Sequence, residues 1–332
     1  MRVPTAVDPE PARPATLGVA FDGRNTLCAL ARQAGAAEAA GADNFWVSSH
    51  LFLRDPVGSA ATVLMATVRA RVCLMAVSPH VMHPVHMAMA AATLEEMAPG
   101  RVILCVGTGA PGDLADAGVR PRRPLRALAE TVELVRLLLA GETVRYRGEL
   151  FTVDGRRLVT GRKQIPIFLA AARPRTLELA GRVADGVLLS NASSVEFVRW
   201  SLDHVDRGSR GRVLGRAGLV YASVAEREAD ALSRFRRQLA ITLRAEHHAV
   251  NLSLAGSRLD QAAVRQALAR EDWAAAEALV SDDVVRRHTA CGAAIQVRAR
   301  LAAYRAAGLD EVVLGGLYTP EETAQAVTAA LG

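Results

Sequence analysis

The sequence predicts an α/β fold in which eight parallel strands and their helices close into a (β/α)8 barrel. Residues 71–112 have the pattern of a strand, a crossover helix, a second strand and a Gly-rich loop, and similar segments recur along the chain. Apolar residues make up 51% of the 332 residues and aromatic residues only 4%, so the core is built from Ala, Val and Leu. A doubly wound open sheet is the alternative for this alternation.

The unit at residues 71–112 indicates where a ligand site lies. The continuous apolar runs at 71–77 and 102–106 are typical of strands covered on both faces. Residues 84–97 between them are rich in Ala and Met and long enough for a helix, which makes the two strands parallel. The polar and Gly-rich residues after each strand therefore share one edge of the sheet, where α/β folds bind ligands.

Similar patterns along the chain predict the remaining elements. Strands are expected at residues 16–21, 44–47, 165–169, 186–189, 219–224 and 312–314. Helices are expected at residues 26–40, 59–69, 122–139, 175–184, 193–205, 295–307 and 320–331. The alternating residues 142–153 predict a small hairpin outside the main sheet.

We expect one barrel domain at residues 16–332, preceded by a flexible tail at 1–15. Residues 226–290 are almost entirely helical in pattern and too long for one crossover, so they predict a helical insertion after the seventh strand. The Pro-rich N-terminus lacks the apolar stretch of a secretory signal, and no apolar run reaches membrane-spanning length. A cytoplasmic protein without a membrane partner is therefore expected.

Charge and cysteine content narrow the classes of partner. The formal net charge is +6, from 40 Lys and Arg against 34 Asp and Glu, and Arg is spread along the chain without a run of like charge. This pattern favours a solvated surface over nucleic-acid binding, and a modest positive field suits an anionic cofactor or small-molecule substrate. None of the four cysteines forms a CxxC pair, so reduced thiols are expected and a zinc or redox motif is not.

Several sequence blocks occur in the same order in a known family. They are WVSSHLFLRDP at 46–56, AVSPHVMHP at 76–84, GRVILCVGTGAPGDLADAGV at 100–119, IPIFLAAARPRTLELAGRVADGVLL at 165–189, the Cys291-Gly292 step and AGLDEVVLGGLYTP at 307–320. Together they resemble the luciferase-like monooxygenase superfamily, most nearly its F420-dependent methylenetetrahydromethanopterin reductases. The resemblance implies a barrel of the bacterial-luciferase type, a homodimer, and a flavin or deazaflavin held at the C-terminal ends of the strands.

The glycine loop after the fourth strand is a candidate cofactor site. Gly107 and Gly109 let backbone amides approach a phosphate without a Cβ in the way, although a lone GxG also occurs in ordinary turns. The resemblance implies that Gly107, Thr108 and Gly109 lie near the cofactor phosphate.

A second candidate joins the fifth strand to its helix. It contains Ala170, Ala171 and Ala172, followed by Arg173 and Arg175 on either side of Pro174. Pro suits the first turn of a helix, where backbone amides and the two guanidinium groups favour an anion. The alternative is a pair of surface arginines. The family commonly has Gly at the position of Arg173.

The end of the third strand is expected to lie behind the cofactor ring. The resemblance implies a bulge formed by a non-proline cis peptide, and the matching bond joins Met75 and Ala76. Val77 and Ser78 complete this expected cofactor contact. An ordinary strand end is the alternative.

Three polar residues are candidates for the chemistry. Ser49 and His50 follow the second strand, and His80 follows the third. His50 suits a hydrogen bond to the ring or proton transfer to a substrate, and the alternative is a structural histidine. The spacing of His80, His83 and His86 lacks a neighbouring carboxylate for a metal set, so no metal site is predicted.

Ala20 departs from the related reductases, which have a glutamate at the matching position. This departure argues against the pterin reductase activity itself, although Asp22 lies two residues on, on the same strand face. We expect an F420-dependent oxidoreductase that transfers hydride between reduced deazaflavin and an electrophilic C=N or C=C of a small molecule. An FMN-dependent monooxygenase or reductase and a non-catalytic flavin-binding barrel are the alternatives.

Overall fold

Eight parallel strands close into a barrel in the computed structural model, which describes residues 15–332. The last pairing, between β8 and β9, closes the sheet, so it has no free edge in the barrel. In order around the barrel the strands are β1 (Thr16–Phe21), β2 (Asn44–Ser48), β3 (Arg71–Val77), β4 (Val102–Val106), β7 (Ile167–Ala171), β8 (Gly186–Leu189), β9 (Gly215–Val224) and β11 (Glu311–Gly315). The predicted barrel is confirmed, and the doubly wound sheet is excluded.

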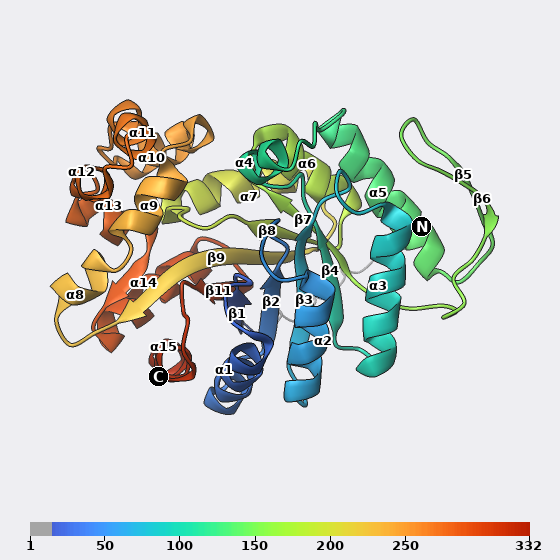
Figure 1. The fold of residues 1–332 in the computed structure, drawn as a ribbon, viewed down its shortest axis with the longest axis horizontal. Helices are drawn as coiled ribbons and strands as arrows, with labels where there is room; N and C mark the ends of the chain where they lie inside the picture. The colour runs from blue at the N-terminus through green and yellow to red at the C-terminus, as the bar shows by residue number, and fades with distance from the viewer. Residues whose placement is uncertain (1–14) are drawn as a thin grey trace, which may run out of the picture.

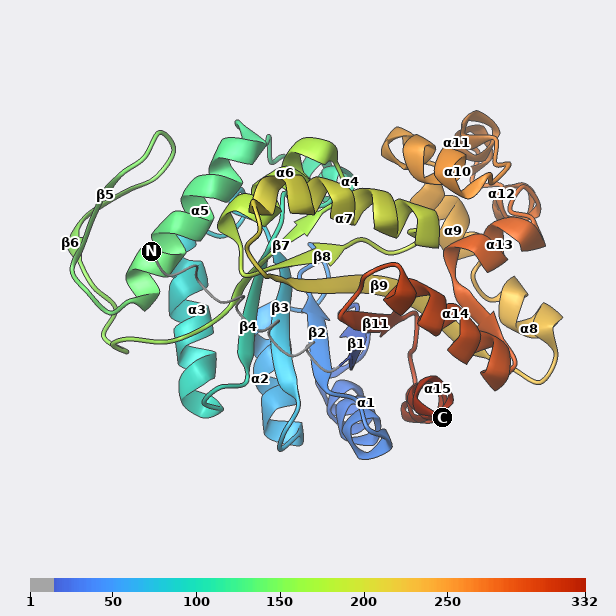
Figure 2. The ribbon, with the colours of Figure 1, turned by 180° about the vertical axis from the view of Figure 1, so that it is seen from behind.

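Helices surround the barrel on its outer side (Figure 1 and Figure 2). They are α1 (Leu27–Ala40), α2 (Pro56–Ala66), α3 (Pro84–Met97), α5 (Pro124–Leu139), α6 (Pro174–Val183), α7 (Val195–Ser209), α14 (Ala294–Ala306) and α15 (Pro320–Leu331). Side-chain caps begin several of them; for example, Asp55 accepts a 2.8 Å hydrogen bond from the Gly58 amide at the start of α2. Within residues 15–332, no helix has both the length and the apolar character that crossing a bilayer requires.

Some element boundaries differ from the sequence prediction. β9 begins at Gly215 rather than at residue 219, and the added residue Arg216 turns its side chain to Asp206 on α7. β7 begins at Ile167 because Pro166, which precedes it, has no amide hydrogen to donate. A short helix, α4 (Pro111–Asp116), follows the glycine loop and was not predicted.

The hairpin β5 (Val144–Arg147) and β6 (Thr152–Arg156) forms a separate two-stranded sheet, as the alternating sequence predicted. It stands away from the barrel beyond α5 (Figure 1). Its turn is held by Glu130 of α5, which is 1% exposed and accepts hydrogen bonds from the amides of Glu149, Leu150 and Phe151.

Between β9 and a short strand, β10 (Ala290–Gly292), the chain is helical and lies at one end of the barrel (Figure 1). The helices are α8 (Glu228–Ser233), α9 (Arg236–Leu243), α10 (Ala249–Ala255), α11 (Gln261–Ala269), α12 (Trp273–Ala278) and α13 (Asp282–His288). They share a buried cluster that includes Leu239, Leu243 and Val264, and β10 pairs with the far end of β9. The expected N-terminal tail lies outside the described residues, except for residue 15.

The barrel interior is filled in layers from alternate strands, as in other closed (β/α)8 sheets. Trp46 and Phe168 pack edge to face inside the barrel, with ring centroids 5.7 Å apart. Ala20, Ala76 and Ala170 belong to the same interior cluster but stay partly exposed. The interior is therefore filled by large aromatic side chains, whereas small side chains leave it partly exposed at the C-terminal end.

Candidate functional site

The C-terminal mouth of the barrel has a floor of small side chains. Ala20, Ala76 and Ala170 form its uppermost layer with Leu219, each from an alternate strand and each partly exposed. Side chains alternate along a strand, so the next inward positions on the other four strands are Ser48, Gly107, Ser190 and Gly315. A flat ligand can therefore rest on this floor without displacing a large side chain.

The third strand carries a bulge where the resemblance implied one. Leu74 pairs with Leu104 and Val77 with Val106, so Met75 and Ala76 together lie opposite the single residue Cys105. The expected cis peptide between Met75 and Ala76 is wrong, because every peptide bond in residues 15–332 is trans. The extra residue is accommodated by the shift in register instead. Met75 and Ala76 face the interior, whereas Val77 packs in the outer core.

A hydrogen-bonded bridge joins the ends of β3 and β4. The Ser78 hydroxyl donates to the Thr108 carbonyl at 3.0 Å, and the Gly107 amide donates to the Val77 carbonyl at 3.0 Å. Gly109 has a positive φ of 85°, which favours glycine. A Cβ added to Gly107 would lie 2.9 Å from the Ala76 Cβ, so glycine keeps the space above the floor open. The structure thus brings together two of the predicted cofactor segments.

The two histidines after Ser78 have different environments. His80 is half-buried, its Nε2 is buried without a hydrogen-bond partner among the described residues, and burial lowers its pKa. His83 is the N-cap of α3, and its Nδ1 accepts a 3.2 Å hydrogen bond from the Val85 amide. His83 therefore has a structural role, whereas a neutral His80 retains a nitrogen for a ligand. In the described part of the chain, no three His, Cys, Asp or Glu side chains are arranged to hold a metal ion.

The loop after β2 meets the loop after β4. His50 Nδ1 lies 3.6 Å from the Asp113 carboxylate on α4, and both side chains are partly exposed. The Ser49 amide donates to the Met75 carbonyl, which ties this loop to the bulge. Asp113 was not a sequence candidate, since nothing local marks it; only the fold brings it to His50.

The α6 N-terminus presents the predicted basic residues. Arg173 is its N-cap residue, and both Arg173 and Arg175 are exposed. Ala170 faces the barrel interior, whereas Ala171 is buried in the outer core and Ala172 is partly exposed. The three alanines therefore do not line the mouth equally.

Beside Arg173 lies a pocket of about 300 Å³ that also contains Trp200, Glu246 and His247. Burial and the nearby Arg173 charge lower the pKa of His247. Sequence reasoning missed Trp200 and His247, because they come from α7 and the inserted helices.

The far side of the mouth holds polar groups of which the sequence analysis singled out only Asp22. Asn191 donates a 2.7 Å hydrogen bond to the hydroxyl of Tyr221, whose pKa burial raises to about 12. Asp22 and Tyr318 lie near Tyr221 and raise its pKa, and Asp22 also raises the pKa of Tyr318. Asp22 follows β1, Asn191 follows β8, Tyr221 lies on β9 and Tyr318 follows β11. Of these strands, β9, β11 and β1 lie across the barrel from β3, β4 and β7.

A larger cavity, of about 960 Å³, lies at the opposite end of the barrel. It is lined by residues at the N-terminal ends of the strands, including Arg71, Asp185, Arg216 and Glu311. Ligand chemistry in closed (β/α)8 barrels lies at the other end, where the strands run out into the βα loops. The mouth is therefore the candidate active site.

The fold and this mouth define a (β/α)8-barrel protein whose ligand site lies at the C-terminal ends of its strands. The chain belongs to the luciferase-like monooxygenase family, because the model of that family matches residues 3–311. The expected family is thereby confirmed.

The chain is similar to several characterised proteins. It is 29% identical over 305 residues to 5,10-methylenetetrahydromethanopterin reductase of Archaeoglobus fulgidus, covering 86% of this chain and 89% of that protein. It is 33% identical over 178 residues to an F420-dependent glucose-6-phosphate dehydrogenase of Nakamurella multipartita, covering 50% of this chain and 52% of that protein.

Solved structures show the same fold at lower sequence identity. The F420-dependent tetrahydromethanopterin reductase of Methanopyrus kandleri has a TM-score of 0.87 at 22% identity, over 95% of this chain and 97% of that one. An F420-dependent secondary alcohol dehydrogenase, solved with an F420–acetone adduct, has a TM-score of 0.80 at 20% identity, over 96% of this chain and 99% of that one.

Proposed function

We propose that the protein is an F420-dependent oxidoreductase that transfers hydride between reduced deazaflavin and an electrophilic C=N or C=C of a small molecule. The observation that carries this proposal is the alanine floor of the mouth, bordered by the β3 bulge and the glycine loop. The names of the relatives support F420 as the cofactor rather than FMN. F420 supplies hydride from C5 of its deazaflavin ring, and the protein supplies the binding and the orientation.

The residues present fit a cofactor of this kind. Gly107 leaves room beside Ala76 that a Cβ would fill, so a flat ring can approach the bulge. The buried Nε2 of His80 has no partner among the described residues and is free to bond a ligand. Arg173 and Arg175, at the N-terminus of α6, would attract the cofactor phosphate and its acidic tail.

Ala20 supports a substrate other than the pterin of the related reductases. It is partly exposed on the floor and carries no group for proton transfer. His50 and Ser49 remain the proposed polar groups on the cofactor side, with Asp113 orienting His50. The substrate would lie over the open face of the ring.

Titration of the purified protein with F420 and with FMN, followed by fluorescence, tests the proposal. Saturable binding of F420 in preference to FMN is expected, with oxidation of reduced F420 by members of a panel of imines and enones. Preferential binding of FMN would support the alternative cofactor. Binding without turnover across the panel would support a non-catalytic flavin-binding barrel.

Two glycine variants connect this test to the mouth. Gly107→Ala places a Cβ 2.9 Å from that of Ala76 and is expected to weaken F420 binding about tenfold. Gly112→Ala, five residues on, meets nothing within 4 Å and serves as the matched control. Equal affinities of the two variants would contradict a cofactor ring lying against the bulge.

We also propose that the protein forms a homodimer. Neighbouring α2 and α3 carry exposed apolar side chains, including Met65 at 74% and Met89 at 47% exposure, and such side chains support association. Light scattering of the eluting protein should give twice the chain mass of 35.2 kDa, and a monomer would contradict this proposal.

A further inference from the structure

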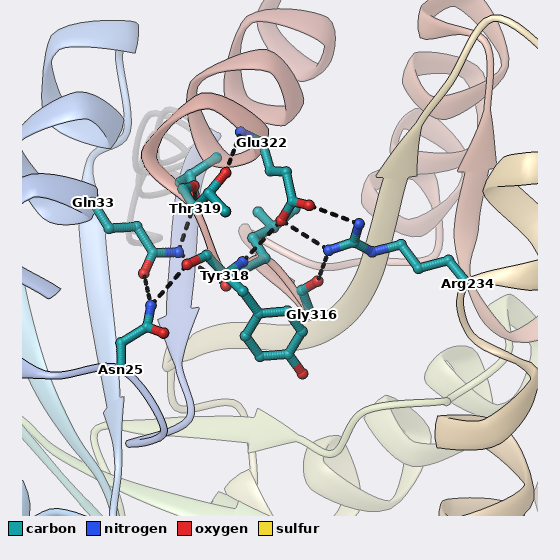
Figure 3. Close-up of polar contacts among 9 residues, drawn as sticks. Asn25, Gln33, Arg234, Gly316, Tyr318, Thr319 and Glu322 are labelled. Atoms are coloured by element: carbon teal, nitrogen blue, oxygen red, sulfur yellow. Dashed lines mark hydrogen bonds and ion pairs between the residues drawn. The ribbon is translucent and has the colours of Figure 1, made fainter. Parts of the chain in front are cut away.

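The loop after β11 presents a tyrosine at the far side of the mouth. Tyr318 is 40% exposed, and its ring projects away from the polar network that surrounds its backbone (Figure 3). The strands nearest to it, β9, β11 and β1, are contiguous and lie across the barrel from β3, β4 and β7. A substrate lying over a cofactor ring at the bulge would therefore lie beside the part of the mouth that contains Tyr318.

Hydrogen bonds from the side of the inserted helices hold the backbone of this loop. Arg234 donates two 2.8 Å hydrogen bonds to the Glu322 carboxylate and one of 3.1 Å to the Gly316 carbonyl. Glu322 in turn accepts a 3.1 Å hydrogen bond from the Tyr318 amide (Figure 3). A bidentate pair of this kind fixes geometry as well as charge.

The first helix clamps the same loop from the other side. Asn25 donates to the Tyr318 carbonyl at 2.9 Å and to the Gln33 side-chain oxygen at 2.8 Å. Gln33, which is 1% exposed, donates to the Leu317 carbonyl at 2.9 Å. Both peptide groups of Tyr318 are thus bonded, so little freedom remains except rotation of the side chain.

Three charged groups, Asp22, Arg24 and Arg234, lie near enough to the Tyr318 phenol to influence its pKa. Asp22 lies two residues beyond Ala20, just past the end of β1, and its side chain is 35% exposed and also binds Arg24. Burial and then the Asp22 carboxylate raise the pKa of Tyr318, whereas the Arg24 and Arg234 guanidinium groups lower it; the net shift is upward, so the phenol keeps its proton at neutral pH. The neighbouring Tyr221 is stacked on Phe235, with ring centroids 5.1 Å apart.

We propose that Tyr318 binds the reacting heteroatom of the substrate and gives it a proton, and that Asp22 positions the Tyr318 hydroxyl. The proposal rests on the proposed function, in which reduced deazaflavin is the reductant. In the reduction of an imine, the carbon accepts hydride with its electron pair and the C=N π electrons move to nitrogen. Nitrogen takes the Tyr318 proton, and the phenolate regains one from water beside the partly exposed Asp22. Tyr318 and Asp22 together would replace the glutamate that the related reductases have at the position of Ala20.

The first test compares Tyr318→Phe with Tyr146→Phe. Tyr146 lies on the β5–β6 hairpin, and its hydroxyl bonds Glu133. With F420 and the cyclic imine 2-methyl-1-pyrroline as probe, Tyr318→Phe should keep F420 affinity within twofold and lose about 100-fold in kcat. Tyr146→Phe should match the wild type in both. An unchanged kcat in Tyr318→Phe would overturn the inference and leave the proposed function intact, whereas failure of the wild type to bind F420 would remove the proposed function itself.

The second test does not depend on turnover. The chain has four tyrosines, so 3-fluorotyrosine labelling gives four fluorine NMR signals, with that of Tyr318 identified by its loss in Tyr318→Phe. The Tyr318 signal should titrate at higher pH in the wild type than in Asp22→Asn, and it should shift when the imine probe is added to the F420-loaded protein. The inference would be overturned if the Tyr318 signal titrated at the same pH in Asp22→Asn and in the wild type, or if it did not shift when the probe was added.

Discussion

The Ser78 hydroxyl bonds the Thr108 carbonyl at 3.0 Å, and this contact joins the bulged end of β3 to the glycine loop after β4. Ser78 is 5% exposed, so the contact is shielded from water. The same hydroxyl accepts a 3.3 Å hydrogen bond from the His80 amide, which sets the path of the chain past the mouth. One side chain therefore orders two segments that the proposed function assigns to the cofactor.

Ser78→Ala should loosen this bridge. The loss of one buried hydrogen bond costs about 1 kcal/mol, which corresponds to an increase of about fivefold in the Kd for F420. Ser201→Ala on α7 is the control, because the Ser201 hydroxyl is buried without a partner among the described residues. Fluorescence titration measures both variants, and a Ser78→Ala affinity equal to that of the control would show that the bridge does not order the cofactor site.

Arg173→Ala should weaken F420 binding through charge. Removal of a guanidinium group at the α6 N-terminus is expected to raise the Kd about tenfold at low salt. The difference from the wild type should shrink as ionic strength rises, because exposed charges are screened. Arg182→Ala, in the last turn of the same helix, should bind F420 as the wild type does. A salt-independent effect of Arg173→Ala would point to packing instead.

The buried Glu311 gives stability a pH dependence. Its carboxylate accepts a 2.8 Å hydrogen bond from the Trp46 indole, and burial raises its pKa from 4.5 to about 7. The unfolded carboxyl loses its proton at lower pH than the folded one, so the free energy of unfolding falls as pH rises through this range. A shift of this size corresponds to about 3 kcal/mol.

Glu311→Gln should remove this pH dependence. The free energy of unfolding of the variant, measured with urea, should gain about 3 kcal/mol relative to the wild type between the two pKa values. The exposed Glu321→Gln variant should follow the wild type at every pH. Parallel curves for Glu311→Gln and the wild type would refute the assignment to Glu311.

Glu130 is expected to hold the β5–β6 hairpin in place. Its buried carboxylate accepts hydrogen bonds from Arg126 and from three successive amides, which Glu130→Ala would leave unpaired. A cost of about 3 kcal/mol in the free energy of unfolding is expected. Glu133→Ala, one turn on and exposed, loses only its bond to Tyr146 and should cost less than about 1 kcal/mol. Equal costs would indicate that the amide bonds contribute little.

The strands and the glycine loop could be predicted because their signals are local. An apolar run such as residues 102–106 indicates a buried strand by itself, and the Gly107 loop directly follows it. β9 was shortened in the prediction because Gly215 and Arg216 do not resemble a buried strand, although Arg216 is accommodated by its ion pair with Asp206. The bulge at Met75 and Ala76 was expected at the right place, but it needs no cis peptide.

Contacts that depend on closure of the barrel could not be predicted. His50 meets Asp113 because β2 and β4 end at the same mouth, and Asn25 bonds Tyr318 across 293 positions of sequence. His247 joins Arg173 only through the packing of the inserted helices. The local sequence around Tyr318 and His247 does not indicate which distant residues they contact.

The three alanines beneath the mouth also determine how readily this scaffold can be adapted. Exchange of Ala20, Ala76 or Ala170 for a bulkier apolar residue would raise the base of the chamber while the hydrogen-bonded wall of strands stays as it is. The depth available to a guest molecule is thus adjustable one methyl group at a time. Variants of this barrel can therefore accept a different ligand through substitutions at these three positions, without changes in the loops.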